Sequence, residues 1–240
     1  MILGIDTSAK TASAAVCDGE RIIAQSQLNT PLTHSQTALP MVQAMLDCAR
    51  LTPEDVDLFA VSAGPGSFTG LRIGVAAVKA LAFTLGKPCA GVSTLEAMAR
   101  NMTGIDGVVC SVMDARCQQV YTALFEVSEG GKRFERLCAD SAISLQELEA
   151  RLAGLKKTEK PAILVGDGAE MCYNILKERI EIRLAPPMLR YQTGYGVCMA
   201  AREALERGET VAAHELMPVY LRLPQAERER NARLGINSNK

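Results

Sequence analysis

A repeat constrains the fold of this chain more than any other feature of its sequence. The order of an apolar strand, an aspartate, a polar turn and a second strand begins at Ile2 with Asp6 and begins again at Gly107 with Asp114, 108 residues after the first aspartate. A structural unit that occurs twice predicts two similar lobes. Strands that end in glycine turns and lead into helices predict α/β layers. We therefore predict an α/β protein of two similar lobes.

Hydrophobic periodicity and turn residues place the other elements. Apolar residues gather in short runs typical of strands, or recur every three to four residues as in helices, with turns such as Asp18-Gly19 between them. The predicted strands cover residues 2–6, 13–17, 21–24, 58–62, 107–114, 120–125 and 162–165. The predicted helices cover residues 35–49, 71–85, 144–152, 170–178 and 193–207. We divide the chain into lobes at 1–103 and 104–192, a helix and extension at 193–224, and a flexible tail at 225–240.

The predicted helix over residues 71–85 is apolar on nearly all sides. Only Arg72, Gly74, Lys79 and Thr84 are not Ala, Val, Ile, Leu or Phe. Such a helix must be covered by its own sheet and by a second body. The second body is either more of the same chain, in a thick core, or a partner protein. The residues alone leave both alternatives open.

Composition and charge exclude several classes of protein. With 48% hydrophobic residues, 26 Lys and Arg, 27 Asp and Glu and a net charge of −1, the chain is neither disordered nor a basic nucleic-acid binder. Eight scattered cysteines without a Cys-x-x-Cys pair argue against structural zinc and indicate a reducing compartment, hence the cytoplasm. The N-terminus has no basic region before its apolar residues and reaches Asp6 early, so we predict neither a signal peptide nor a membrane span.

Three loops carry candidate ligand-binding chemistry. Asp6, Thr7 and Ser8 offer a carboxylate and hydroxyls that suit a phosphate or a metal–phosphate complex, although taken alone these residues fit better an Asx or ST turn that closes a hairpin. Residues 64–66 precede a helix and could bind an anion or simply pack tightly. They do not form a P-loop, because no Gly-Lys-Ser/Thr follows. Residues 166–168 form a Gly-Asp-Gly turn that would admit a flat ligand such as adenine.

No local pattern predicts catalysis. His34 and His214 have no His or Cys at metal-ligand spacing, and the chain lacks a Gly-x-Ser-x-Gly nucleophile motif. We predict no catalytic residue and no metal site. The residues by themselves support a two-lobed α/β protein with nucleotide-like loops.

Four segments together resemble the TsaB (YeaZ) family of the actin-like ATPase superfamily. They are residues 2–8, residues 63–74 (Ala-Gly-Pro-Gly-Ser-Phe-Thr-Gly-Leu-Arg-Ile-Gly), residues 113–116 and residues 218–222. The resemblance implies a duplicated actin-like ATPase (ASKHA) fold whose last helix can return to the first lobe. It also implies a degenerate nucleotide site that binds ATP or ADP weakly and requires no cofactor. That implied site consists of Asp6, Thr7, Ser8, Asp114, Gly166, Asp167 and Gly168.

The same resemblance implies a role beside a catalytic sister protein, TsaD. In TsaD the segment after the long apolar helix carries His-x-x-x-His, which binds a catalytic metal. Here Thr94 and Met98 take the two histidine places, so the resemblance implies a subunit without that metal. The implied function is a non-catalytic partner that supports TsaD, with TsaE and TsaC, in threonylcarbamoyl transfer to the tRNA adenosine beside the anticodon.

The expected contact with TsaD, or with a second copy when the chain is alone, is a four-helix packing. It would use the helices at 35–49 and 71–85, with tRNA bound only indirectly. The predicted contact residues are Leu39, Val42, Met45, Leu46, Leu71, Val75, Val78 and Leu81. An actin-like ATPase or small-molecule kinase is the alternative function, and a peptidase is a third with little physical support.

Overall fold

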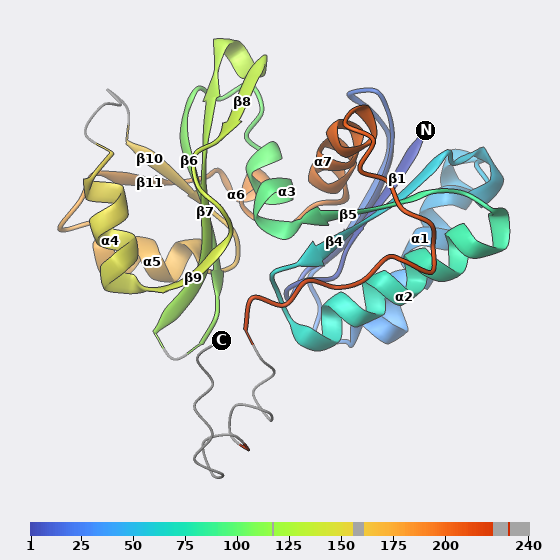
Figure 1. Cartoon of the computed structure of the whole chain (residues 1–240), viewed down its shortest axis with the longest axis horizontal. Coiled ribbons are helices and arrows are strands. Elements are labelled where there is room, and N and C mark those ends of the chain that lie inside the picture. Colours follow the sequence, from blue (N-terminus) through green and yellow to red (C-terminus); the bar gives the residue numbers. More distant parts are fainter. Residues whose placement is uncertain (117, 156–160, 223–229, 231–240) are drawn as a thin grey trace.

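The structure is a computed structural model, and it describes residues 1–116, 118–155, 161–222 and 230. Figure 1 shows two lobes side by side, each built on one mixed sheet. Apart from residue 230, the predicted tail at 225–240 lies outside the described residues.

The first sheet has the strand order β3-β2-β1-β4-β5. Strands β1 and β2 pair antiparallel, as do β2 and β3, whereas β4 lies parallel to both β1 and β5. The hairpin predicted at Asp18-Gly19 is confirmed between β2 and β3, where Gly19 has a φ of 60°. The strands are β1 (Ile2–Asp6), β2 (Ala12–Asp18), β3 (Arg21–Leu28), β4 (Leu58–Gly64) and β5 (Cys89–Ser93).

The second sheet repeats this arrangement with the order β8-β7-β6-β10-β11. Its first three strands are again antiparallel, and β10 is again parallel to both of its neighbours. Strand β9 is an addition that pairs with β7. The strands are β6 (Gly107–Asp114), β7 (Gln119–Ser128), β8 (Arg133–Arg136), β9 (Ser141–Ser144), β10 (Ala162–Val165) and β11 (Ile182–Leu184). Equal order and equal direction confirm the predicted duplicated actin-like fold.

The helices pack on both faces of the sheets. In the first lobe, α1 and α2 cover one face, where their apolar residues join Leu3 and Ile5 of β1 in a core cluster. Because successive strand residues point to opposite faces, Ile2 joins a different cluster with α7. The helices are α1 (His34–Ala49), α2 (Phe68–Leu85), α3 (Thr94–Arg100), α4 (Leu145–Ala153), α5 (Ala169–Leu176), α6 (Pro187–Arg190) and α7 (Gly194–Glu206), with short 3-10 turns η1 (Pro53–Asp55) and η2 (Glu129–Gly131).

Two helices cross between the lobes. The helix α3 follows the first sheet in the chain but contacts β6 and β7 of the second sheet, whereas α7 follows the second sheet but contacts β1, β2 and β5 of the first. The two helices also contact each other, and Figure 1 shows them at the junction of the lobes. The lobes therefore share their central layer, so the boundary drawn at residue 192 stays a prediction.

The helix α2 has well-defined ends and the composition of a core helix. Ser67 caps its start by accepting a hydrogen bond from Gly70 N, and Gly86 ends it at a φ of 63°. By length and composition alone its 18 residues could cross a membrane. It contacts β4 and β5, and Ala77 and Val78 are buried, but only 39% of its 18 residues are buried, so packing within the chain accounts for part of its apolar character.

Candidate functional site

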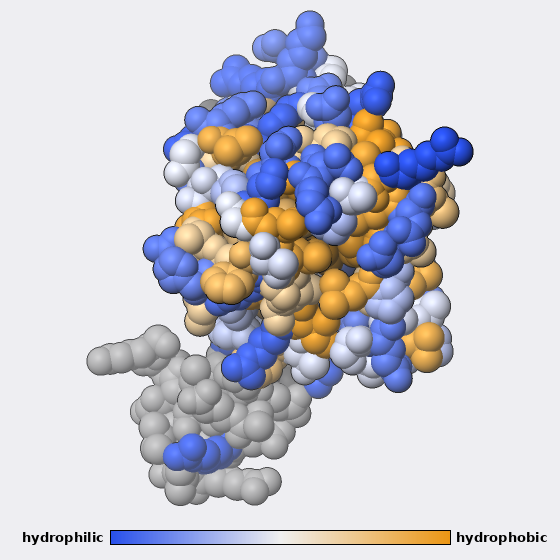
Figure 2. Space-filling view, turned by 90° about the vertical axis from the view of Figure 1, so that its right-hand side faces the viewer, coloured by the Kyte–Doolittle hydropathy of each residue, from blue (hydrophilic) through white to orange (hydrophobic). Residues whose placement is uncertain are grey.

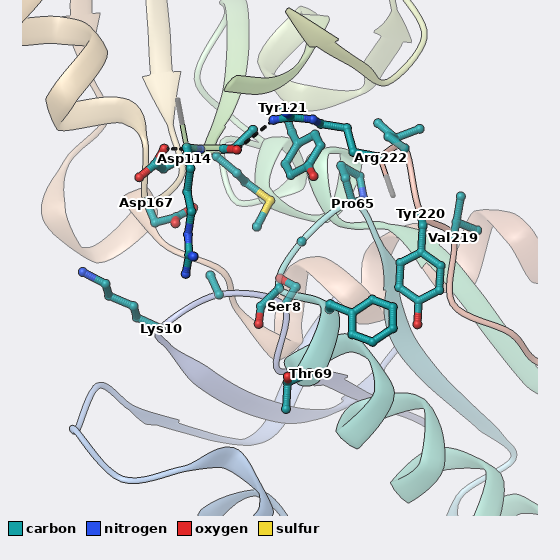
Figure 3. A pocket seen from close by; sticks show the side chains of 18 residues that line it. Ser8, Lys10, Pro65, Thr69, Asp114, Tyr121, Asp167, Val219, Tyr220 and Arg222 are labelled. Atoms are coloured by element: carbon teal, nitrogen blue, oxygen red, sulfur yellow. Dashed lines mark hydrogen bonds between the residues drawn. The ribbon is translucent and has the colours of Figure 1, made fainter. Parts of the chain in front are cut away.

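A cleft of about 410 Å³ lies between the lobes, where β1 and β6 end. Segments 8–10 and 65–69 of the first lobe form one side, and segment 113–116 of the second lobe faces them. Tyr121, Asp167 and residues 219–222 complete the lining, and Figure 3 shows these side chains around the opening. The two loops that the sequence repeat predicts therefore do meet across one cleft.

Asp6 is not part of the cleft surface. Its side chain is fully buried, with Oδ1 accepting hydrogen bonds from Ser8 N (2.8 Å) and Ser8 Oγ (2.7 Å) and Oδ2 accepting one from Ser62 Oγ. Burial raises the pKa of this carboxyl group, against the lowering effect of the Ser62 and Ser8 hydrogen bonds. Of the predicted trio, only Ser8 lines the cleft, and the Asp6–Ser8 bond forms the alternative turn.

The loop at residues 6–8 is packed against the start of α2. Thr7 is also buried, and its Oγ1 donates a hydrogen bond to Gly70 O (2.8 Å). A Cβ atom on Gly66 would lie 2.6 Å from Ser8 O, and one on Gly70 would overlap Thr7 O. The glycines of segment 64–74 therefore serve close packing, which is one of the two alternatives that the sequence left open.

The Gly-Asp-Gly turn places its aspartate at the cleft and its glycines behind it. A Cβ atom on Gly166, whose φ is 108°, would overlap Val112 O, and one on Gly168 would lie 3.0 Å from Asp114 N. Both glycines thus allow the turn to pack on β6, and neither lines the cleft. Whether the turn accepts an adenine stays a prediction.

Asp114 and Asp167 bring two carboxyl groups to the cleft. Asp114 is exposed, and its Oδ1 accepts a hydrogen bond from Arg116 N (2.7 Å). Asp167 Oδ1 accepts a hydrogen bond from Gln192 Nε2 (3.2 Å). Burial raises the pKa of Asp167 to about 6, and the nearby charges of Asp114 and Asp6 act in the same direction. A group with this pKa can gain or lose a proton near neutral pH.

Residues 211–222 form a strap that the sequence patterns did not predict as a structural element. It pairs with β5 through Val211 and Cys89, and Val219 N donates a hydrogen bond to Ala63 O (2.7 Å). The Tyr220 ring lies 4.8 Å from the ring of Phe68, centroid to centroid. Arg222 Nη1 then donates to Ala115 O (2.9 Å) across the cleft. The sequence analysis assigned it only to an extension after the last helix, and the family resemblance rests on its residues 218–222.

The two residues that stand where the resemblance implies histidines in TsaD are packed in the core. Thr94 and Met98 are both fully buried, and Met98 Sδ would lie 3.0 Å from a Cβ atom on Gly166. No group of three or more His, Cys, Asp or Glu side chains able to hold a metal occurs in the described ranges. A thioether and one hydroxyl do not match the ligands of a catalytic zinc or magnesium ion.

The predicted partner face of α1 and α2 needs a correction. Six of the eight predicted contact residues are buried in the chain's own core, where a partner cannot reach them. They are Val42, Met45, Leu46, Leu71, Val75 and Val78. The prediction was wrong for these six because it chose the most apolar stripe of each helix, which is the stripe that packs on the sheet. Leu39 is 48% exposed, and Leu81 is half-buried.

The outward side of these helices is itself partly apolar. Phe83 is 76% exposed, and the small residues Ala76 and Ala80 are exposed on the same helix. Figure 2 looks onto the first-lobe end of the molecule and shows a band of apolar surface there between charged side chains. We call the surface made by Leu39, Ala76, Ala80 and Phe83 the outer face.

Comparisons with known proteins give two related descriptions, TsaD from the family model and TsaB from the similar proteins. A family model described as TsaD, tRNA N6-adenosine threonylcarbamoyltransferase, matches residues 28–230. The tRNA threonylcarbamoyladenosine biosynthesis protein TsaB of Bacillus subtilis is 31% identical over 228 residues, which are 94% of this chain and 96% of that protein. The chain belongs to the TsaB family. TsaB of Escherichia coli is 30% identical over 92% of this chain and 94% of its own length.

A solved structure supports the same assignment. YeaZ from Pseudomonas aeruginosa superposes with a TM-score of 0.75 at 28% identity, covering 92% of this chain and 99% of that one. The recognition of the TsaB (YeaZ) family from four sequence segments is thus confirmed. The names of its members place the TsaB family in the biosynthesis of threonylcarbamoyladenosine on tRNA.

Proposed function

We propose that this TsaB protein is a non-catalytic subunit that binds a TsaD-family protein and supports threonylcarbamoyl transfer to tRNA adenosine beside the anticodon. TsaE and TsaC complete the proposed system, which works on tRNA in the cytoplasm. The observation that carries the proposal is the filled position at Thr94 and Met98. Where the sister protein would hold its catalytic metal, this chain has core packing.

The cleft adds a second argument against catalysis by this chain. A phosphate-transferring enzyme of this fold needs a carboxylate that can reach the metal–phosphate complex. Asp6, the residue in the first-lobe position for that task, is fully buried and engaged by Ser8 and Ser62. The carboxylates of Asp114 and Asp167 remain at the cleft, but they come from one lobe only.

The outer face supports a binding role. Phe83 exposes a large apolar side chain on the helix that also exposes the small residues Ala76 and Ala80, and Leu39 exposes another on α1. Small residues between larger ones let a second pair of helices approach closely. Burying this surface against the like helices of a TsaD-family protein, or of a second copy when the chain is alone, would remove it from water. In this arrangement the tRNA is bound by the complex, since this chain has a net charge of only −1.

Reconstitution tests the proposal. Purified TsaD, TsaE and TsaC are mixed with tRNA, threonine, bicarbonate and ATP, with this chain present or omitted. We expect threonylcarbamoyladenosine to form only with the chain present, and none to form when TsaD is left out. Unchanged product without the chain would refute the supporting role.

The cleft favours a second candidate function, that of an actin-like ATPase or small-molecule kinase. Asp114, Asp167 and Lys10 line it and could contact a nucleotide with its magnesium ion. Calorimetry with ATP and magnesium on the isolated chain separates the two functions. We expect weak binding at most and no requirement for a cofactor, whereas micromolar, magnesium-dependent binding would favour the enzyme.

A further inference from the structure

The two repeated aspartates have equivalent places in the two lobes and opposite surroundings. Asp114 ends β6, is exposed and lines the cleft. Asp6 ends β1, is fully buried and accepts hydrogen bonds from Ser8 N, Ser8 Oγ and Ser62 Oγ. Since the two sheets share their strand order and direction, the two aspartates can be compared directly, and only Asp6 is held inside its lobe.

The loop that Asp6 organises holds the first turns of α2. Thr7 Oγ1 donates to Gly70 O (2.8 Å), and Ser67 N donates to Ser8 O (2.7 Å). A Cβ atom on Gly74 would lie 2.5 Å from Thr7 Oγ1, so the loop and the helix touch without intervening side chains. A shift of this loop must therefore shift the helix.

Asp6 is hydrogen-bonded both to this loop and to the strand that leads into α2. Its Oδ1 fixes Ser8 through the backbone and the hydroxyl group, and its Oδ2 accepts from Ser62 on β4, the strand that leads into α2. An 18-residue helix is about 27 Å long. A small tilt at the first turn of α2 is therefore magnified toward Phe83 near its other end.

We propose that Asp6 is a positioning residue for the outer face of α2, and that it acts in partner binding without touching the partner. The proposal rests on the proposed function for the role of the outer face. In this role the Asp6 carboxyl group sets the angle of α2 against the first sheet. The side chain that could have held a phosphate complex instead holds a helix.

Three variants and one control test this role. Asp6→Ala removes the acceptor, and Thr7→Val removes the hydroxyl bond to Gly70 with little change of shape. Asp6→Asn keeps an oxygen for Ser8, and the Ser62 hydroxyl can accept from its amide, so it should restore the wild-type behaviour. Asp18→Ala is the control, because Asp18 is exposed at the end of β2 in the same sheet.

The readouts are amide hydrogen exchange in residues 70–76 and the dissociation constant for the purified TsaD protein of the same organism. We expect Asp6→Ala and Thr7→Val to exchange faster there and to bind about tenfold more weakly, the size of one lost buried hydrogen bond. Asp6→Asn and Asp18→Ala should match the wild type in both measurements.

The outcomes separate the two proposals. Failure of the wild-type chain to bind TsaD refutes the proposed function. If the wild type binds and both Asp6→Ala and Thr7→Val bind equally well, the positioning role is refuted while the proposed function stands. Unchanged amide hydrogen exchange in residues 70–76 of Asp6→Ala and Thr7→Val also refutes the positioning role. If Asp6→Ala does not fold, Thr7→Val decides the question.

Discussion

Replacing Asp167 by asparagine should stabilise the protein at neutral pH. The folded state raises the pKa of this carboxyl group from 3.8 to about 6, chiefly because the group is buried. The folded state therefore binds the proton more tightly than the unfolded state does. Stability then falls as the pH rises from about 4 to about 6, and the full cost is present above that window. Asparagine cannot ionise, so it avoids this cost.

The size of the effect follows from the pKa shift. The difference between a pKa of 3.8 and a pKa of about 6 corresponds to a free energy of about 3 kcal/mol. The amide group adds a further advantage, because Gln192 Oε1 is buried without a hydrogen-bond partner among the described residues and could accept from it. We expect the free energy of unfolding of Asp167→Asn to be about 2–3 kcal/mol higher than that of the wild type at pH 7.5. At pH 4 the two free energies should differ little.

Urea unfolding followed by circular dichroism, repeated from pH 4 to pH 8, measures this difference. Asp18→Asn is the matched control, because the Asp18 side chain is exposed and should show no comparable gain. A difference between Asp167→Asn and wild type that stays constant across the pH range would refute the argument, as would a loss of stability at pH 7.5.

Three further predictions concern packing and charge. Leu46→Ala should lower the free energy of unfolding by about 2–5 kcal/mol, because the Leu46 side chain is buried. Leu39→Ala should change it by less than about 0.5 kcal/mol, because Leu39 on the same helix is 48% exposed. Equal losses in urea titrations would contradict the corrected partner face. Gly70→Ala should cost about 2–4 kcal/mol because its Cβ overlaps Thr7 O, and a variant with the wild-type Tm would show that α2 can shift freely. Arg100→Met should lower the free energy of unfolding by about 3 kcal/mol. The substitution removes the buried cation that pairs with Glu96 and Glu203 and that lies over the Phe134 ring. Thermal unfolding at the wild-type temperature would show that Arg136 and Arg207 compensate.

Repeats and hydrophobic runs in the sequence predicted most of the fold. The Asp6 and Asp114 units and the periodic helices depend on residues within a few positions of each other, so local rules describe them. The strap at 211–222 and the strand β11 were missed because they are held by contacts with distant segments rather than by their own patterns. Tertiary contacts decided those segments.

The candidate site was predicted less well, for a related reason. Sequence identifies a carboxylate at the end of a strand but not which way its neighbours turn. Asp6 and Asp114 both end a strand, yet Asp6 is buried and also accepts a hydrogen bond from Ser62, which is 56 residues away, whereas Asp114 is exposed. Likewise, the apolar stripe of α2 was visible, but its direction toward the sheet depended on where the rest of the lobe lay. The hydrogen bond between Asp167 and Gln192 likewise joins residues that are 25 positions apart in the chain.

The crossing of α3 and α7 has a consequence for synthesis on the ribosome. One face of the first sheet, with Ile2, Ala15 and Leu58, is covered by α7, whose residues 194–206 are made near the end of translation. Until those residues leave the exit tunnel, the first lobe exposes an apolar sheet face to solvent. Chains emerge at about 5–20 residues per second, so this exposure lasts on the order of ten seconds. During that interval the nascent first lobe is a natural client for chaperones, although its own strands were among the earliest to be made.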